Sequence, residues 1–316
     1  MARFVFFGGK GGVGKTSMSA AYAHKLATAG ESVLLVSTDP AHSTADVFDQ
    51  EFGDEPTPVE GYDSLSAVEI DPEREVTEHL METKRALGDQ VSAGIVNEID
   101  RQLELAHQTP GAHESALFDR FIEIMREADH DRVVFDTSPT GGTLRLLSLP
   151  EYLGGWIDRL VEKREASIDL YERAAIGGRE PRRSALGDPI LARLRERKEK
   201  FEFARETLRD EAEFVLVANP DELSVRETER AVGSLAERDL PVAGVIVNRL
   251  TPAPDDDENG RGARFLRDRI ATEEERLAEL EALDPPLLAA IETRVSEVKG
   301  SFLAEVAAEL DIETTI

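Results

Sequence analysis

The sequence predicts an α/β fold: a mostly parallel sheet flanked by helices, with an inserted all-helical subdomain. Three observations lead to this prediction. Short apolar runs typical of buried strands alternate with stretches of helical spacing towards both ends of the chain. A glycine-rich turn joins the first of these strands to the first helix. Two long polar stretches of helical period, at about 73–128 and 151–210, interrupt the alternation.

The glycine-rich turn has the spacing of a phosphate-binding loop. Residues 9–16 read Gly-Lys-Gly-Gly-Val-Gly-Lys-Thr, a Gly followed by four residues and then Gly-Lys-Thr. The apolar run 4–7 precedes the loop and an Ala-rich helix at 17–26 follows it, so backbone N–H groups and a helix N-terminus would face an anion. We therefore expect a nucleoside triphosphate here. The residues expected to contact it in the loop are Gly9, Lys10, Gly11, Gly12, Val13, Gly14, Lys15, Thr16 and Ser17.

Two side chains of the loop have expected chemical roles. Lys15 should reach the terminal phosphates, and the Thr16 hydroxyl should complete a Mg²⁺ coordination shell. The alternative is a chance glycine-rich turn between a strand and a helix, which the matching flanks disfavour. ATP and Mg²⁺ are therefore the expected ligands.

Carboxylates follow two later apolar runs, at 33–37 and 132–136. Asp39 stands just beyond the first run and Asp136 ends the second. Because the carboxyl ends of parallel strands meet at one edge of a sheet, we expect both near the phosphates. Asp39 would orient or deprotonate the attacking water, and both carboxylates would support Mg²⁺, partly through water. The alternative role for Asp39 is to cap the helix that begins after Pro40.

The rest of the chain continues the alternation. Further strands are expected at 64–72, 214–219 and 243–249, with a strand-like piece after Pro285, and further helices at 115–126, 225–237, 261–283 and 301–310. Asn248 ends one of these strands, where its amide suits a base edge, although Asn there is also a common turn former. We expect a single P-loop domain over 1–316, with a core at about 1–72, 129–150 and 211–316 and a helical subdomain from the two polar insertions.

Composition excludes several classes of function. Cysteine is absent, so we expect neither zinc held by thiolates nor an iron–sulfur cluster. The net charge of −27, from 64 acidic and 37 basic residues, argues against binding to nucleic acid or anionic lipid. It is also typical of proteins that stay dissolved in high salt, so we expect a halophilic source; the alternative is a basic partner. No run of 18 apolar residues occurs and the first strand starts at once, so a cytoplasmic location is expected.

Taken together, these motifs resemble those of the ArsA/Get family of ATPases. Lys10 matches the early lysine of the deviant phosphate loop that this family shares with MinD and ParA. Further signature matches are spread over the chain. They are Ser-Thr-Asp-Pro-Ala-His-Ser at 37–43, Glu-Ile-Asp-Pro at 69–72, Asp-Thr-Ser-Pro-Thr-Gly-Gly-Thr-Leu-Arg-Leu-Leu at 136–147, and Val-Asn-Arg at 247–249.

The resemblance implies a homodimeric, Mg²⁺-dependent ATPase in the cytoplasm, transiently at a membrane. Lys10 would act across the dimer interface, so that Asp39, Lys10 and Lys15 are the implied catalytic residues, and Asn248 would bind adenine. The helical insertions would form a groove for hydrophobic tail-anchor helices, with a membrane receptor as a further partner. The implied function is the targeting of tail-anchored membrane proteins.

Two alternatives remain, together with several departures from the family. An arsenical pump-driving ATPase would energise a membrane transporter, but arsenite prefers thiolates, which this chain lacks. A MinD- or ParA-like spatial regulator is disfavoured, because no basic residue follows Lys299 and the net charge repels DNA.

The sequence departs from the pattern of the ArsA/Get family at Ser43, Ser138 and Gly142, and it lacks a Cys pair near 258–261.

Overall fold

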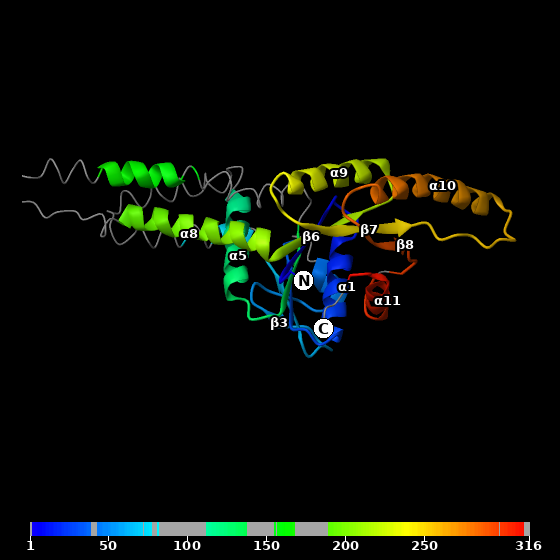
Figure 1. Ribbon diagram of the computed structural model, residues 1–316. Helices are drawn as coiled ribbons and strands as arrows, with labels where there is room; N and C mark the ends of the chain where they lie inside the picture. Colours follow the sequence, from blue (N-terminus) through cyan, green and yellow to red (C-terminus); the bar gives the residue numbers. More distant parts are fainter. Residues whose placement is uncertain are drawn as a thin grey trace, which may run out of the picture.

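The computed structural model describes residues 2–38, 43–71, 73–77, 81, 112–137, 155, 157–167, 189–296 and 298–312 (Figure 1). These residues contain an eight-stranded sheet with the order β3-β4-β2-β5-β1-β6-β7-β8. The strands are β1 Phe4–Gly9, β2 Val33–Ser37, β3 Thr57–Pro58, β4 Leu65–Glu69, β5 Arg132–Asp136, β6 Ala212–Ala218, β7 Val242–Leu250 and β8 Leu287–Glu292. All neighbouring pairs are parallel except β3 with β4. The predicted α/β fold with a mostly parallel sheet is confirmed.

The helices are α1 Lys15–Thr28, α2 Ser43–Phe48, α5 Ala112–Glu127, α8 Pro189–Asp210, α9 Glu222–Ala236, α10 Arg261–Glu281 and α11 Ser301–Glu309, with further helical residues at 73–77 and 157–167. The ends of α1, α5, α9, α10 and α11 lie within three residues of the predicted ranges, whereas α2 had no predicted range and α8 lies within the second polar stretch. Among the described residues, no helix combines the length and the apolar character that a bilayer crossing requires.

The central strand β1 shows why the strands are apolar on both faces. Phe4 and Phe6 point to one side, where they join residues of α5, α8 and α9, whereas Val5 and Phe7 point to the other side, towards α1 and α11. The ring of Phe6 stacks on that of Phe135 in β5, with centroids 4.4 Å apart. A parallel strand covered by helices on both faces must bury every side chain, so it reads as a continuous apolar run.

Two helices from the predicted insertions cover the sheet. Phe118 and Phe121 of α5 and Phe201 of α8 are buried in the same cluster as Phe6. The N-terminal part of α8 extends away from the sheet beside the helical residues 157–167 (Figure 1), where Arg195 pairs with Glu165 at 2.8 Å. A separate helical subdomain at about 73–128 and 151–210 stays a prediction, because many of those residues lie outside the described part of the chain.

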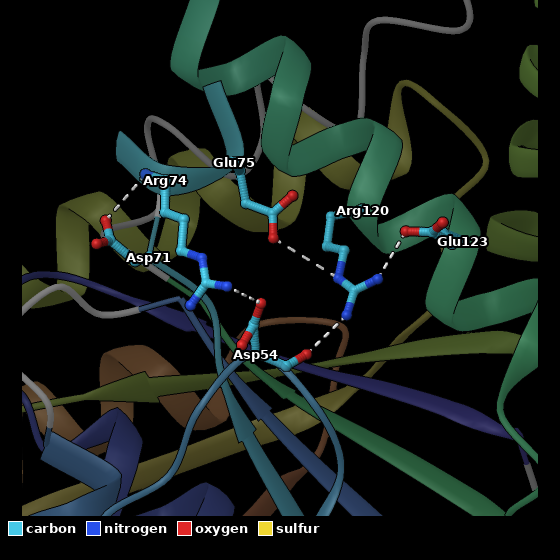
Figure 2. A network of polar contacts seen from close by, with 6 residues as sticks. All are labelled: Asp54, Asp71, Arg74, Glu75, Arg120 and Glu123. Carbon is cyan, nitrogen blue, oxygen red and sulfur yellow. Dashed lines mark hydrogen bonds and ion pairs between the residues drawn. The ribbon is translucent and has the colours of Figure 1, made fainter. Parts of the chain in front are cut away.

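A network of charges fastens α5 to the segment that leaves the sheet after β4 (Figure 2). The Arg120 guanidinium donates to the Glu123 carboxylate and to the Asp54 backbone carbonyl, both at 2.7 Å. It also lies 3.7 Å from the carboxylate of Glu75. Arg74 in turn pairs with the Asp54 carboxylate at 3.1 Å. The network thus joins α5 to helical residues 73–77 through the loop that contains Asp54.

Candidate active site

The phosphate loop links β1 to α1 and includes left-handed backbone that only glycine adopts easily. Gly14 has φ 95° and forms the N-cap of α1, and its carbonyl accepts a hydrogen bond from the Met18 N–H at 3.1 Å. A Cβ at Gly14 would lie 2.4 Å from Nδ2 of Asn248. At Gly9, with φ 147°, a Cβ would lie 2.3 Å from the Val217 carbonyl oxygen. The loop is therefore seated closely between the ends of β6 and β7.

Asn248 connects β7 to this loop, although β7 continues to Leu250 and does not end at Asn248 as expected. Its side-chain Nδ2 donates to the Val13 carbonyl at 2.8 Å, and its Oδ1 accepts from the Arg249 N–H at 2.9 Å. The side chain is buried, and the next residue, Arg249, has a left-handed φ of 65° where the pairing of β7 with β8 shifts register between Asn248 and Leu250. The amide therefore fixes the loop backbone. Its expected contact with adenine stays a prediction.

Thr16 and Asp136 meet where α1 begins and β5 ends. The Thr16 hydroxyl donates to Asp136 Oδ2 at 2.6 Å, and Asp136 is only 1% exposed. The backbone around this carboxylate is held in place, because the Asp136 carbonyl accepts from the Thr38 N–H at 3.1 Å and the Thr137 hydroxyl donates to the Phe7 carbonyl at 2.7 Å. A hydroxyl and a carboxylate are hard oxygen ligands of the kind that Mg²⁺ prefers, with water completing its shell. The residues present therefore fit Mg²⁺.

The two loop lysines lie close together in the structure. Lys15, in the first turn of α1, is 9% exposed, and its ammonium donates to the Lys10 carbonyl at 3.2 Å. Ser17 follows Thr16 in the same helical turn, beside the helix N-terminus. A buried ammonium over a glycine-rich turn, together with the positive end of a helix, provides an electrostatic environment suited to phosphate.

The structure therefore brings the expected site residues of the phosphate loop together with Asp136 and Asn248, at the carboxyl edge of β1, β5 and β7. Asp39 lies outside the described residues, as do the departures Ser138 and Gly142. Of the described residues, no group of three or more His, Cys, Asp or Glu side chains is arranged to hold a metal ion. Oxygen ligands from Thr16 and Asp136 with water do not require such a group.

Sequence reasoning missed one residue at this edge. Glu69, the last residue of β4, is 6% exposed, and its Oε1 accepts hydrogen bonds from the N–H groups of Thr44 and Ala45 at 3.1 and 3.0 Å. In the sequence, Glu69 was noted only as the first residue of the signature Glu-Ile-Asp-Pro at 69–72. An acidic residue that ends a buried apolar strand was the available signal, because such a carboxylate requires a partner.

Comparison with known proteins shows that this chain is similar to known ATPases over almost its whole length. Residues 2–310 match the family of anion-transporting ATPases of the ArsA type. The chain is 34% identical over 281 residues to a protein of Aquifex aeolicus named for an arsenical pump-driving ATPase, covering 88% of each chain. It is 32% identical over 311 residues to the ATPase get3 of Pyrenophora tritici-repentis, covering 94% of this chain and 87% of the relative. With the ATPase GET3A of Arabidopsis thaliana the identity is 34% over 278 residues, covering 87% and 73%.

Proposed function

Since the chain belongs to the family of anion-transporting ATPases and is itself an ATPase, we propose that it uses ATP hydrolysis to open and close a homodimer that captures and targets tail-anchored membrane proteins. The observation that carries the nucleotide part of this proposal is the hydrogen bond between Thr16 and buried Asp136 beside the phosphate loop. The family relationship over nearly the whole chain supports the targeting part.

The residues of the site divide the work of hydrolysis. The loop and Lys15 bind the phosphates, and Thr16 and Asp136 hold Mg²⁺. When bound, the metal ion supplies positive charge against the charge that develops on the transferred phosphoryl group. Asp39 orients the attacking water. Lys10 of one subunit completes the site of the other, as an arginine finger does, so hydrolysis requires a closed dimer.

The choice between targeting and arsenical pumping depends on cysteine. A relative named for arsenical pumping favours the second function. However, trivalent arsenic selects thiolates, and the chain contains no cysteine. An apolar helix needs no such ligand, because it binds through buried apolar area in a groove. Targeting is therefore the function that the chemistry of this chain favours.

Trapping of a client by a variant that binds ATP without hydrolysing it tests the proposal. Asp39→Asn and wild type would be co-expressed with a tail-anchored membrane protein and purified in high salt with ATP and Mg²⁺. We expect the variant, and not wild type, to retain stoichiometric client. The matched control is the same client with two arginines in the middle of its anchor, which should not be retained.

The opposite result separates the two functions. An active ATPase whose Asp39→Asn variant never retains the anchor contradicts targeting. A rate that rises with arsenite would then assign the pump function, in spite of the missing thiolates.

A further inference from the structure

We infer that the loop between β7 and α10, together with the first two turns of α10, is a contact surface between two copies of this chain. We call this segment, residues 252–267, the β7–α10 arm. The inference rests on the homodimer of the proposed function and names a surface that holds the two copies together. Figure 1 shows the arm, in yellow and orange, extending away from the sheet.

The arm is fastened together at its base and along its length. At the base, the Thr251 N–H and hydroxyl both donate to the Glu273 carboxylate on α10 at 2.7 Å. Further out, Arg264 and Arg267 of α10 donate to backbone carbonyls of the loop at 3.4 and 3.1 Å. A surface that is ordered before it binds loses little conformational entropy on association. The arm is therefore suited to form a specific contact.

The arm has charges of both signs in two adjacent groups. The loop contributes four consecutive exposed carboxylates, from Asp255, Asp256, Asp257 and Glu258. The start of α10 contributes three arginines, which are Arg261, Arg264 and Arg267. Among the residues that the structure describes, none of these side chains forms an ion pair. Both groups are therefore available to charges on a partner.

An aromatic side chain lies beside these arginines on the solvent side of α10. Phe265 is 63% exposed, whereas Ala263, on the opposite side of the helix, is buried. Arg261 stands one turn before Phe265 on the same face. A single exposed apolar side chain needs no partner by itself. Aromatic residues and arginine are, however, enriched in protein interfaces, and a guanidinium binds favourably over an aromatic ring. Phe265 thus provides an apolar centre with charges around it.

The arrangement of the charges favours a second copy as the partner. A foreign acidic protein would meet the carboxylates of the loop, and a basic one would meet the arginines of the helix. Two copies related by a two-fold axis can instead place the loop of each against the arginines of the other. The chain has a net charge of −27, so two copies repel unless positive charge lies at the contact. The arginines of the arm supply this positive charge.

Reversing the charge of either group should weaken the dimer. One variant combines Arg261→Glu with Arg264→Glu, and the other combines Asp256→Arg with Asp257→Arg. Either variant places like charges at both junctions between a loop and a helix. We expect each to raise the dissociation constant of the dimer by about 10-fold or more.

A control separates this effect from the change in net charge. Arg205→Glu with Arg209→Glu alters the net charge as much as the double arginine variant of the arm does. Both control residues are exposed and lie near the end of α8. This control should leave the dissociation constant within about twofold of wild type.

Mixing the two arm variants provides the most specific result. In a mixed dimer the reversed helix of one copy meets the reversed loop of the other, and the two unchanged groups also meet. Both junctions are then complementary, so the mixture should dimerise within about threefold of the wild-type dissociation constant. Both reversals in one chain should also restore the dimer. If that chain recovers and the mixture does not, the charges act within one copy, which refutes the inference.

Sedimentation velocity would measure dimerisation with Mg²⁺ and a non-hydrolysable ATP analogue, and circular dichroism would measure the folded fraction. The salt concentration is about 0.1 M, where charges in contact are only partly screened. Wild-type dimerisation of both arm variants, or an equal loss in the α8 control, overturns the inference. A monomeric wild type refutes the proposed homodimer itself, whereas a dimeric wild type with fully dimeric arm variants refutes only the role of the arm.

A variant of Phe265 decides the matter if the chain folds only in high salt, because apolar burial is not screened. Phe265→Ser should raise the dissociation constant by about 10-fold or more. Val295→Ser is its control, since Val295 is a fully exposed apolar residue in the segment after β8. Equal dimerisation of the two variants would refute the inference.

Discussion

The close approach of Gly14 to Asn248 makes a sharp prediction about Gly14→Ala. The new Cβ would lie 2.4 Å from Asn248 Nδ2, and the residue would have to keep φ 95°. The Asn248 amide would have to swing away, which breaks its 2.8 Å hydrogen bond to the Val13 carbonyl. The substitution therefore strains the backbone and also detaches the loop from β7.

The size of the effect follows from these two costs. A left-handed conformation costs a non-glycine residue about 1–2 kcal/mol. Loss of a hydrogen bond costs about 1 kcal/mol more. If the free loop avoids both costs by changing its conformation, ATP binding must restore the binding conformation, and the two costs then reduce the affinity for ATP. A total of about 2–3 kcal/mol corresponds to binding that is weaker by about 30- to 150-fold.

Equilibrium binding of ATP with Mg²⁺ would measure this loss, with two comparison variants. Gly30→Ala is the matched control, because Gly30 also has φ 95° but a Cβ there meets nothing within 4 Å and the residue lies in the turn after α1. It should bind ATP normally. Adding Asn248→Ala to Gly14→Ala should remove the clash and leave the backbone strain, so the two substitutions should be less than additive by about 1 kcal/mol. Wild-type affinity in Gly14→Ala, or full additivity, would refute the reasoning.

Three further predictions follow from contacts elsewhere in the structure. Thr16→Ala and Asp136→Asn should each raise the Mg²⁺ concentration needed for half-maximal activity by about 10-fold or more. Ser19→Ala is the control: it removes a hydroxyl that donates to the Thr16 carbonyl at 3.0 Å, and it should leave that Mg²⁺ concentration unchanged. Burial lowers the pKa of His24 below its usual 6.5, so the unfolded chain takes up a proton first as the pH falls. Stability should therefore decrease below about pH 6.5, and urea unfolding between pH 8 and 5 should show a smaller decrease in His24→Gln; equal decreases would contradict this assignment. Arg120→Met should lower the free energy of unfolding by about 1–3 kcal/mol, because it leaves the partners of Arg120 unpaired. Arg226→Met is the control: its ion pair with Glu222 has side chains that are 62% and 61% exposed, so its loss should cost less than about 0.5 kcal/mol. Equal losses would show that the network in Figure 2 adds nothing to stability.

The strands and helices were predictable because the spacing of apolar residues that marks each one lies within a single short segment of the chain. Every predicted strand is present, since a parallel strand buried on both faces produces an apolar run. The added strand β3, with residues Thr57–Pro58, was missed because two residues have no period and Pro is rare in strands. The order of the strands is a property of pairing between distant segments. Thus β5 lies between β2 and β1, which no local pattern records.

The packing of the inserted helices was equally hidden. An amphipathic helix has the same pattern whether its apolar face covers a sheet or another helix. Phe118 and Phe121 of α5 therefore predicted a helix, while their contact with Phe6 on β1 came only from the structure.

The site shows the same limit. The phosphate loop and Thr16 were predictable because their motif is contiguous, and the position of Asp136 followed from the rule that parallel strands end at one edge. The contact of Asn248 with Val13 joins residues 235 positions apart and was not predictable. Glu69 was missed because its role depends on the start of α2, which the pairing of β2 with β4 brings next to it.

The measurement that tests the account most directly is the ATPase activity of mixed dimers. Lys10→Ala and Asp39→Asn should each be inactive alone. If Lys10 acts on the partner's nucleotide, a mixed dimer has one site with both residues intact. Equal mixing should then restore about a quarter of the wild-type rate, since half of the dimers are mixed and each has one working site. If the mixture stays inactive after subunits have exchanged, Lys10 acts within its own subunit, and hydrolysis coupled to dimer closure in this way is contradicted.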